Sequence, residues 1–177
     1  MSEYTLPPPS AFKSLTDAQR IEIITHLFEQ SPALENLITS QFDTADSYSA
    51  FISSTRTLLL DLSSVALTDP SSKSALLEIL AAHPRLGARK ITSDHSVAEQ
   101  KSLQGESEAL AKLNQEYEEK FPGLRYVVFV NGRPRDVIMA NMRERIARGD
   151  YELEKAEAAN AMCDIATDRA RKLGADI

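Results

Sequence analysis

Apolar side chains recur every three or four residues along most of the chain, which is the spacing of one face of an α-helix. Polar and turn-forming residues separate these stretches and set where each helix begins and ends. The pattern predicts helices over residues 16–28, 32–38, 48–62, 70–83, 96–121, 134–149 and 150–174.

Residue types at the helix ends support these boundaries. Thr16 and Gln19 have the spacing of a capping box, in which each side chain satisfies an exposed amide of the first turn. Pro32 suits the first turn of the second helix, where no amide donor is needed. Pro84 disfavours helical geometry at the residue before it, so the fourth helix is expected to end near His83.

One segment departs from the helical pattern. Residues 125–130 are rich in β-branched and aromatic side chains. No partner strand is evident elsewhere in the sequence, and a lone strand leaves its amides unpaired, so we expect a buried extended segment. The chain is therefore predicted to be all-α, a single-domain bundle of about seven or eight helices. Residues 1–11, with three consecutive prolines, are expected to form an arm, and residues 12–177 the helical domain.

Composition narrows the function classes. A formal charge of −6 argues against a nucleic-acid binder, which needs a basic face. No apolar run approaches the ~20 residues of a membrane span, and the N-terminus lacks the pattern of a signal peptide. Cys163 is the only cysteine of the 177 residues, so an intramolecular disulfide or a multi-cysteine zinc site is excluded. No metal-binding motif is evident.

Candidate chemistry concentrates between residues 81 and 100. His83 lies at a predicted helix C-terminus, where the helix dipole favours a protonated imidazole that can donate a proton. The alternative is a capping histidine that only bonds a free carbonyl. Ser96 and Glu99 have capping-box spacing at the next helix start. The same helix start could bind an anion, with Glu99 taking or holding a proton.

Arginines are frequent in the last third of the chain, including Arg169 and Arg171. Most are expected to lie on the surface. An arginine that faces inward would bind a carboxylate or a ureido group through its planar set of donors.

Three motifs together resemble a known family. His83-Pro84-x-Leu86-Gly87, Ser96-x-x-Glu99-Gln100 and Leu113-Asn114-x-x-Tyr117-x-x-Lys120-Phe121 occur in the order found in OHCU decarboxylases. OHCU is 2-oxo-4-hydroxy-4-carboxy-5-ureidoimidazoline, an intermediate of urate degradation. The resemblance runs from about residue 12 to residue 172 and covers nearly the whole chain.

The resemblance implies an all-α enzyme, commonly a homodimer, that removes CO2 from OHCU to give (S)-allantoin without a cofactor or a metal. It implies a small-molecule substrate, no nucleic acid and no membrane partner. A cytoplasmic or peroxisomal location is expected, although the chain does not end in the peroxisomal signal Ser-Lys-Leu.

The resemblance also assigns site residues. The catalytic residues are expected to be His83, Glu99 and Arg169, with Arg171 as the alternative arginine. The substrate-binding residues are expected to be Pro84, Ser96, Val97, Ala98, Gln100, Tyr126, Val127, Val128, Phe129 and Val130.

Two alternatives stay open at this point. A related enzyme of the same fold could act on another ureido or carboxylated heterocycle. A non-catalytic helical interaction module would use His83 and Ser96 to Glu99 only as helix caps, and would lack a polar pocket that joins His83, Glu99 and an arginine.

Overall fold

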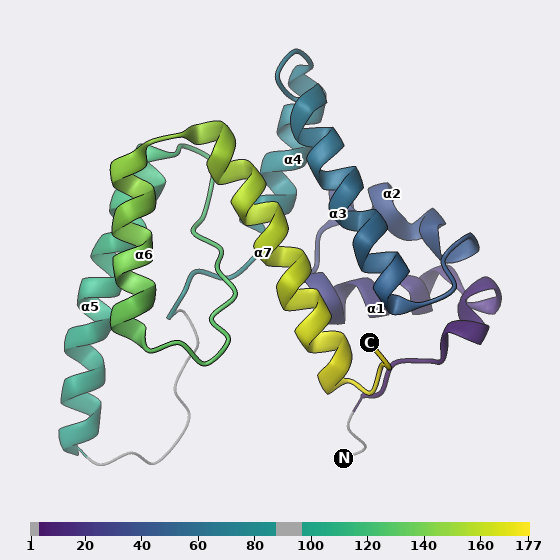
Figure 1. Ribbon diagram of the computed structural model, residues 1–177, viewed down its shortest axis with the longest axis horizontal. Helices are drawn as coiled ribbons and strands as arrows, with labels where there is room; N and C mark the ends of the chain where they lie inside the picture. The colour runs from purple at the N-terminus through teal and green to yellow at the C-terminus, as the bar shows by residue number, and fades with distance from the viewer. Residues whose placement is uncertain (1–3, 88–96) are drawn as a thin grey trace.

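The computed structural model describes residues 4–87 and 97–177, and the side chains of residues 97–106 are outside the description. The described chain forms seven α-helices and two short 3-10 helices (Figure 1). In chain order these are η1 (Pro9–Ser14), α1 (Asp17–Phe28), α2 (Pro32–Ile38), η2 (Thr39–Asp43), α3 (Tyr48–Val65), α4 (Pro70–Ala81), α5 (Val97–Lys120), α6 (Arg135–Arg148) and α7 (Tyr151–Lys172).

The predicted helices are confirmed, with ends within three residues of those expected; α3 continues to Val65 instead of ending near residue 62. Most caps form as expected. The side chains of Thr16 and Gln19 make the reciprocal capping box of α1. Ser31 accepts a hydrogen bond from the amide of Leu34 at the start of α2. α4 ends at Ala81, two residues before His83, which is the effect expected of Pro84.

The first four α-helices gather on one side of α7, and α5 and α6 lie on the other side (Figure 1). α7 packs against α3 and α1, and α5 packs against α6. One cluster of buried apolar side chains includes residues from all seven α-helices. α7 thus lies between α1–α4 on one side and α5 and α6 on the other. Its last turns can therefore bring a side chain to the place where these two groups of helices meet.

The N-terminal arm, from residue 4 onward, packs onto the end of α7, so that the two ends of the described chain lie close together (Figure 1). The amide of Leu6 donates to the carbonyl oxygen of Leu173 at 3.0 Å. The hydroxyl of Tyr48 donates to the carbonyl oxygen of Pro7 at 2.7 Å. The arm is extended only as far as Pro8, because η1 begins at Pro9, within the segment expected to be extended. These contacts fix the C-terminal end of α7.

A buried ion pair fastens α6 to α7. Arg145 donates from Nη2 to Oε2 of Glu154 at 2.7 Å, and the Glu154 side chain is fully buried. Tyr117 of α5 donates its hydroxyl to the same carboxylate at 2.5 Å. Burial alone would lower the pKa of Arg145, but the hydrogen bond and the charge of Glu154 outweigh it and raise the pKa. Arg145 therefore stays charged in the core.

The same guanidinium holds the extended segment. Arg145 Nη1 donates to the carbonyl oxygen of Val127 at 3.2 Å, and its guanidinium lies over the ring of Tyr126, 4.7 Å from the centroid. The segment between α5 and α6 is extended, and the described residues contain no β-strand. The all-α prediction is thus confirmed. No helix in the described part of the chain is long and apolar enough to span a membrane.

Replacing Glu154 by Gln should destabilise the protein, because Arg145 would lose its fully buried counterion and keep only the partly exposed carboxylate of Glu157, 2.9 Å from its Nε. We expect the free energy of unfolding in urea to fall by up to about 3–5 kcal/mol. Glu144→Gln, at an exposed position of α6, is the matched control and should change it by less than about 0.5 kcal/mol. Equal effects of the two substitutions would contradict this role of the pair.

Candidate functional site

A cleft of about 810 Å³ lies where three parts of the chain meet. The loop after α4 contributes His83 and Pro84, the extended segment contributes residues 128–130, and the last turns of α7 contribute Arg169. Polar side chains thus enter the cleft beside the apolar wall formed by residues 128–130, which is the usual make-up of a small-molecule site.

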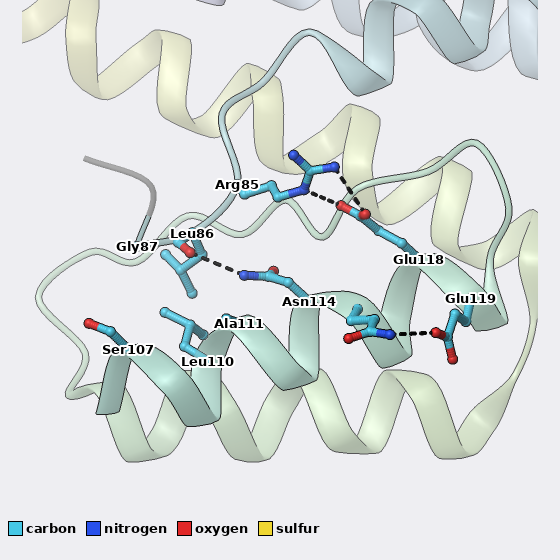
Figure 2. Close-up of a pocket in the computed structure, with 10 residues that line it drawn as sticks. Arg85, Leu86, Gly87, Ser107, Leu110, Ala111, Asn114, Glu118 and Glu119 are labelled. Atoms are coloured by element: carbon cyan, nitrogen blue, oxygen red, sulfur yellow. Dashed lines mark hydrogen bonds and ion pairs between the residues drawn. The ribbon is translucent and has the colours of Figure 1, made fainter. Parts of the chain in front are cut away.

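The loop that carries His83 is fastened to α5 (Figure 2). Arg85 donates two hydrogen bonds to the carboxylate of Glu118, from Nε at 2.7 Å and from Nη2 at 3.1 Å. Asn114 donates from Nδ2 to the carbonyl oxygen of Leu86 at 3.1 Å. The loop also borders a second, smaller hollow of about 430 Å³ against α5. Paired side chains of α5 therefore set where the His83 loop lies.

Gly87 allows the loop to approach α5 closely. Its φ of +80° is in the left-handed region that side chains disfavour. A Cβ atom built there would lie 2.7 Å from Cδ2 of Leu110, which is buried. The turn favours glycine at this position, and an alanine would also force the Leu110 side chain to shift.

Hydrogen bonds from arginine side chains fix both ends of the extended segment that forms the cleft wall. Arg133 donates to the carbonyl oxygen of Phe129 at 2.6 Å and to that of Val130 at 3.2 Å. At the start of the segment, Arg125 donates to the carbonyl oxygen of His83 at 3.4 Å. Side-chain donors thus bond carbonyl groups of a segment that has no partner strand among the described residues.

Arg169 is held by the end of α1. Its Nη2 nitrogen lies 2.7 Å from Oε1 of Glu29, and both side chains are about one-quarter exposed, at 23% and 28%. Its Nη1 nitrogen donates to the carbonyl oxygen of Leu27 at 3.4 Å. One turn later in α7, Lys172 pairs with Asp168 at 2.6 Å. The described lining carries four basic side chains and two carboxylates, which favours an anionic ligand.

Glu29 has an unusual backbone conformation. Its φ of 98° and ψ of 163° lie in a region that is essentially restricted to glycine. A residue with a side chain is destabilised there by about 1–3 kcal/mol. Such strain, in a residue whose side chain lines the cleft, is typical of functional sites.

Several of the predicted site residues lie in this cleft. They are His83, Pro84, Val128, Phe129, Val130 and Arg169. Arg171, the alternative arginine, is exposed and outside the cleft lining. The roles of the cleft residues stay predictions.

Tyr126 and Val127 are buried instead of lining the cleft. The hydroxyl of Tyr126 donates to Oδ1 of Asn141 at 2.6 Å, and burial raises its pKa to about 12. Their contact with a substrate, which the resemblance implies, stays a prediction.

The second motif is described only in part. Ser96 lies outside the described residues, as do the side chains of Val97, Ala98, Glu99 and Gln100. α5 begins at Val97, directly after Ser96, as the capping-box spacing predicts. The predicted meeting of His83 with Glu99 therefore stays a prediction.

Sequence reasoning missed Glu29, Asp168 and Lys172 as cleft residues. Asp168 could have been found because it directly precedes Arg169 in the chain. Lys172 could have been found because it lies four residues, about one helical turn, after Asp168. Glu29 gave no signal, since its position depends on the contact between α1 and α7.

Within the described residues, no group of three His, Cys, Asp or Glu side chains could hold a metal ion. Cys163 is buried, and burial raises its pKa to about 11, so its thiol stays protonated.

A family model described as OHCU decarboxylase matches residues 13–171. The match includes every described residue of the cleft lining except Lys172, which lies one position beyond its end. The chain belongs to the OHCU decarboxylase family.

Individual relatives match less of their own length. The 2-oxo-4-hydroxy-4-carboxy-5-ureidoimidazoline decarboxylase of Haloferax volcanii is 36% identical over 84 residues, which are 44% of this chain and 49% of that relative. A crystal structure of (S)-allantoin synthase has a TM-score of 0.63 at 17% identity, covering 94% of this chain and 54% of that chain. The chain thus spans about half the length of each, and the structural likeness shows a shared fold.

In this OHCU decarboxylase family member, Gly87→Ala should be more destabilising than Gly132→Ala. Both glycines have positive φ, +80° and +71°, but a Cβ at Gly132 would meet nothing within 4 Å. In both variants, an alanine held in the left-handed conformation should lower the free energy of unfolding by about 1–2 kcal/mol. Urea unfolding should show a further loss for Gly87→Ala alone, because Leu110 must move. Equal losses would show that the close contact with Leu110 is unimportant.

Proposed function

We propose that the protein catalyses the decarboxylation of OHCU to (S)-allantoin without a cofactor. The observation that carries the proposal is the cleft, which brings His83, Arg169 and the apolar wall of residues 128–130 together in a chain of this family. The names of the Haloferax volcanii relative and of the fold relative support the same reaction.

The reaction suits a protein that supplies only orientation and charge. The carboxylate of OHCU is bonded to a carbon that bears a hydroxyl and adjoins a C=N bond. When the C–C bond breaks, CO2 leaves and the electron pair left behind forms a C=C bond to the neighbouring carbon. The π pair of the C=N bond moves onto its nitrogen, which takes up a proton. The resulting enol becomes a ketone when the neighbouring carbon gains a proton and the hydroxyl loses one. Correct placement of the reacting groups can contribute most of the barrier reduction.

Within this proposal, His83 delivers the proton to one face of the enol and so sets the handedness of the product. Glu99 bonds the hydroxyl or the ring and exchanges the second proton. Arg169 binds an anionic or polar edge of the substrate. Gln100 and the backbone groups of residues 126–130 hold the ureido and ring amides.

The assembly and location belong to the proposal as well. A homodimer, in the cytoplasm or in peroxisomes, is supported by the resemblance to the family. Sedimentation equilibrium of the purified protein would show a single species of twice the 19.6 kDa chain mass.

The test of the proposed function is a coupled assay. Urate, urate oxidase and hydroxyisourate hydrolase generate OHCU in place, and circular dichroism follows the appearance of one-handed allantoin. The protein should accelerate that appearance. A rate equal to the spontaneous one would refute the function and would favour a non-catalytic module or another heterocyclic substrate.

In the same assay, His83→Asn should lower kcat by about 10²–10⁴-fold, the usual contribution of a positioned proton donor. His26→Asn is the matched control, because His26 stacks on Tyr4, with ring centroids 3.8 Å apart, outside the cleft lining. Both variants should keep the helical far-UV spectrum. Retained turnover in His83→Asn would refute the role of this residue.

A further inference from the structure

Two residues other than glycine have positive φ in the described part of the chain, and both line the cleft. Asn131 has a φ of 46°, in the left-handed region that asparagine tolerates. Glu29 has a φ of 98°, where a long side chain is not expected. The turn from α1 to α2 needs this backbone angle, and glycine would supply it without strain. The glutamate must therefore contribute something through its carboxylate.

That carboxylate contacts Arg169, at 2.7 Å between Oε1 and Nη2. The arginine also donates to the carbonyl oxygen of Leu27, two residues before Glu29. The C-terminal end of α1 thus holds the guanidinium at two points. In the described part of the chain, these two bonds leave the remaining N–H donors of Arg169 for a ligand in the cleft.

A long, flexible arginine side chain loses much rotamer freedom when it binds a substrate. An ion pair that fixes the guanidinium beforehand reduces that loss and sets the plane of its donors. With both side chains about one-quarter exposed (23% and 28%), the pair lies at the cleft wall, where it can act on a bound ligand.

We propose that Glu29 is a positioning residue that holds the Arg169 guanidinium in the cleft, oriented for the anionic or carbonyl edge of the substrate. The proposal rests on the proposed function for the identity of that substrate. The strained backbone is retained because it places the carboxylate beside Arg169. Glu29 acts through the arginine and takes no part in the proton transfers.

The decisive variant is Glu29→Gly, since it removes the carboxylate and relieves the backbone strain together. We expect kcat/KM to fall by up to about 100-fold, because a binding group is no longer placed. The change should lie mainly in KM, since the interaction is present in both the ground state and the transition state. The melting temperature should be unchanged or higher. A merely structural residue would instead lower the melting temperature and leave KM unaltered.

Gln30→Gly is the matched control. Gln30 is exposed in the same turn and outside the cleft lining, so this variant adds the same backbone freedom without touching the ion pair. Its KM should stay close to that of the wild type. Glu29→Gln, which keeps a hydrogen-bond acceptor but loses the charge, should fall between Glu29→Gly and the wild type.

A double-mutant cycle then tests whether the effect passes through the arginine. In an Arg169→Gln background, Glu29→Gly should lower kcat/KM no further, because the partner is already absent. Multiplying effects in the double variant would overturn the proposal. Wild-type kcat/KM in Glu29→Gly would overturn it as well, with the decarboxylase activity left standing.

A readout without substrate separates this proposal from the proposed function. The Nε–H signal of Arg169 in a nitrogen-15 NMR spectrum should shift and change its exchange rate in Glu29→Gly but not in Gln30→Gly. If the wild type does not turn over OHCU, the proposed function fails, and this signal alone tests whether Glu29 positions Arg169. An unchanged signal would overturn the positioning role.

Discussion

The buried pair of Arg145 and Glu154 is the interaction on which the cleft depends. Charged groups are removed from water only when each has a partner, and here one guanidinium meets two carboxylates, two tyrosine rings and a backbone carbonyl. That carbonyl belongs to Val127, in a segment that has no neighbouring strand in the described structure. The Arg145 side chain thus supplies one hydrogen bond that a neighbouring strand would otherwise make, and residues 128–130 remain extended along the cleft wall.

The cleft is assembled at the ends of helices. α1 ends at the cleft with Glu29, α4 ends shortly before His83, and the last turns of α7 supply Arg169. Helix interiors satisfy their own backbone groups and pack closely, so a helical bundle offers few polar groups along its core. Its ends and loops supply both exposed polar atoms and changes of direction. A site made from them needs fastening from outside, and here Glu118, Asn114 and the N-terminal arm provide it.

Local sequence signals predicted the parts of this structure that depend on local interactions. The helices follow from the apolar spacing and from caps such as Thr16 and Pro32, and the end of α4 follows from Pro84. The inward turn of Tyr126 could not be predicted, because it depends on Asn141 of the next helix. Glu29 could not be predicted either, since its backbone angle is set by how α1 meets α2 and α7.

Three basic side chains of the cleft lining are paired with carboxylates: Arg169 with Glu29, Lys172 with Asp168, and Arg85 with Glu118. An anionic ligand that binds there must share a cation with its carboxylate partner or displace that partner. The electrostatic energy of the cation therefore changes little on binding. A simple anion therefore gains little affinity. A planar ligand gains more, because it can add hydrogen bonds to fixed donors and contact the apolar wall of residues 128–130. This balance favours a planar polar ligand over a free anion, although the lining carries an excess of basic groups.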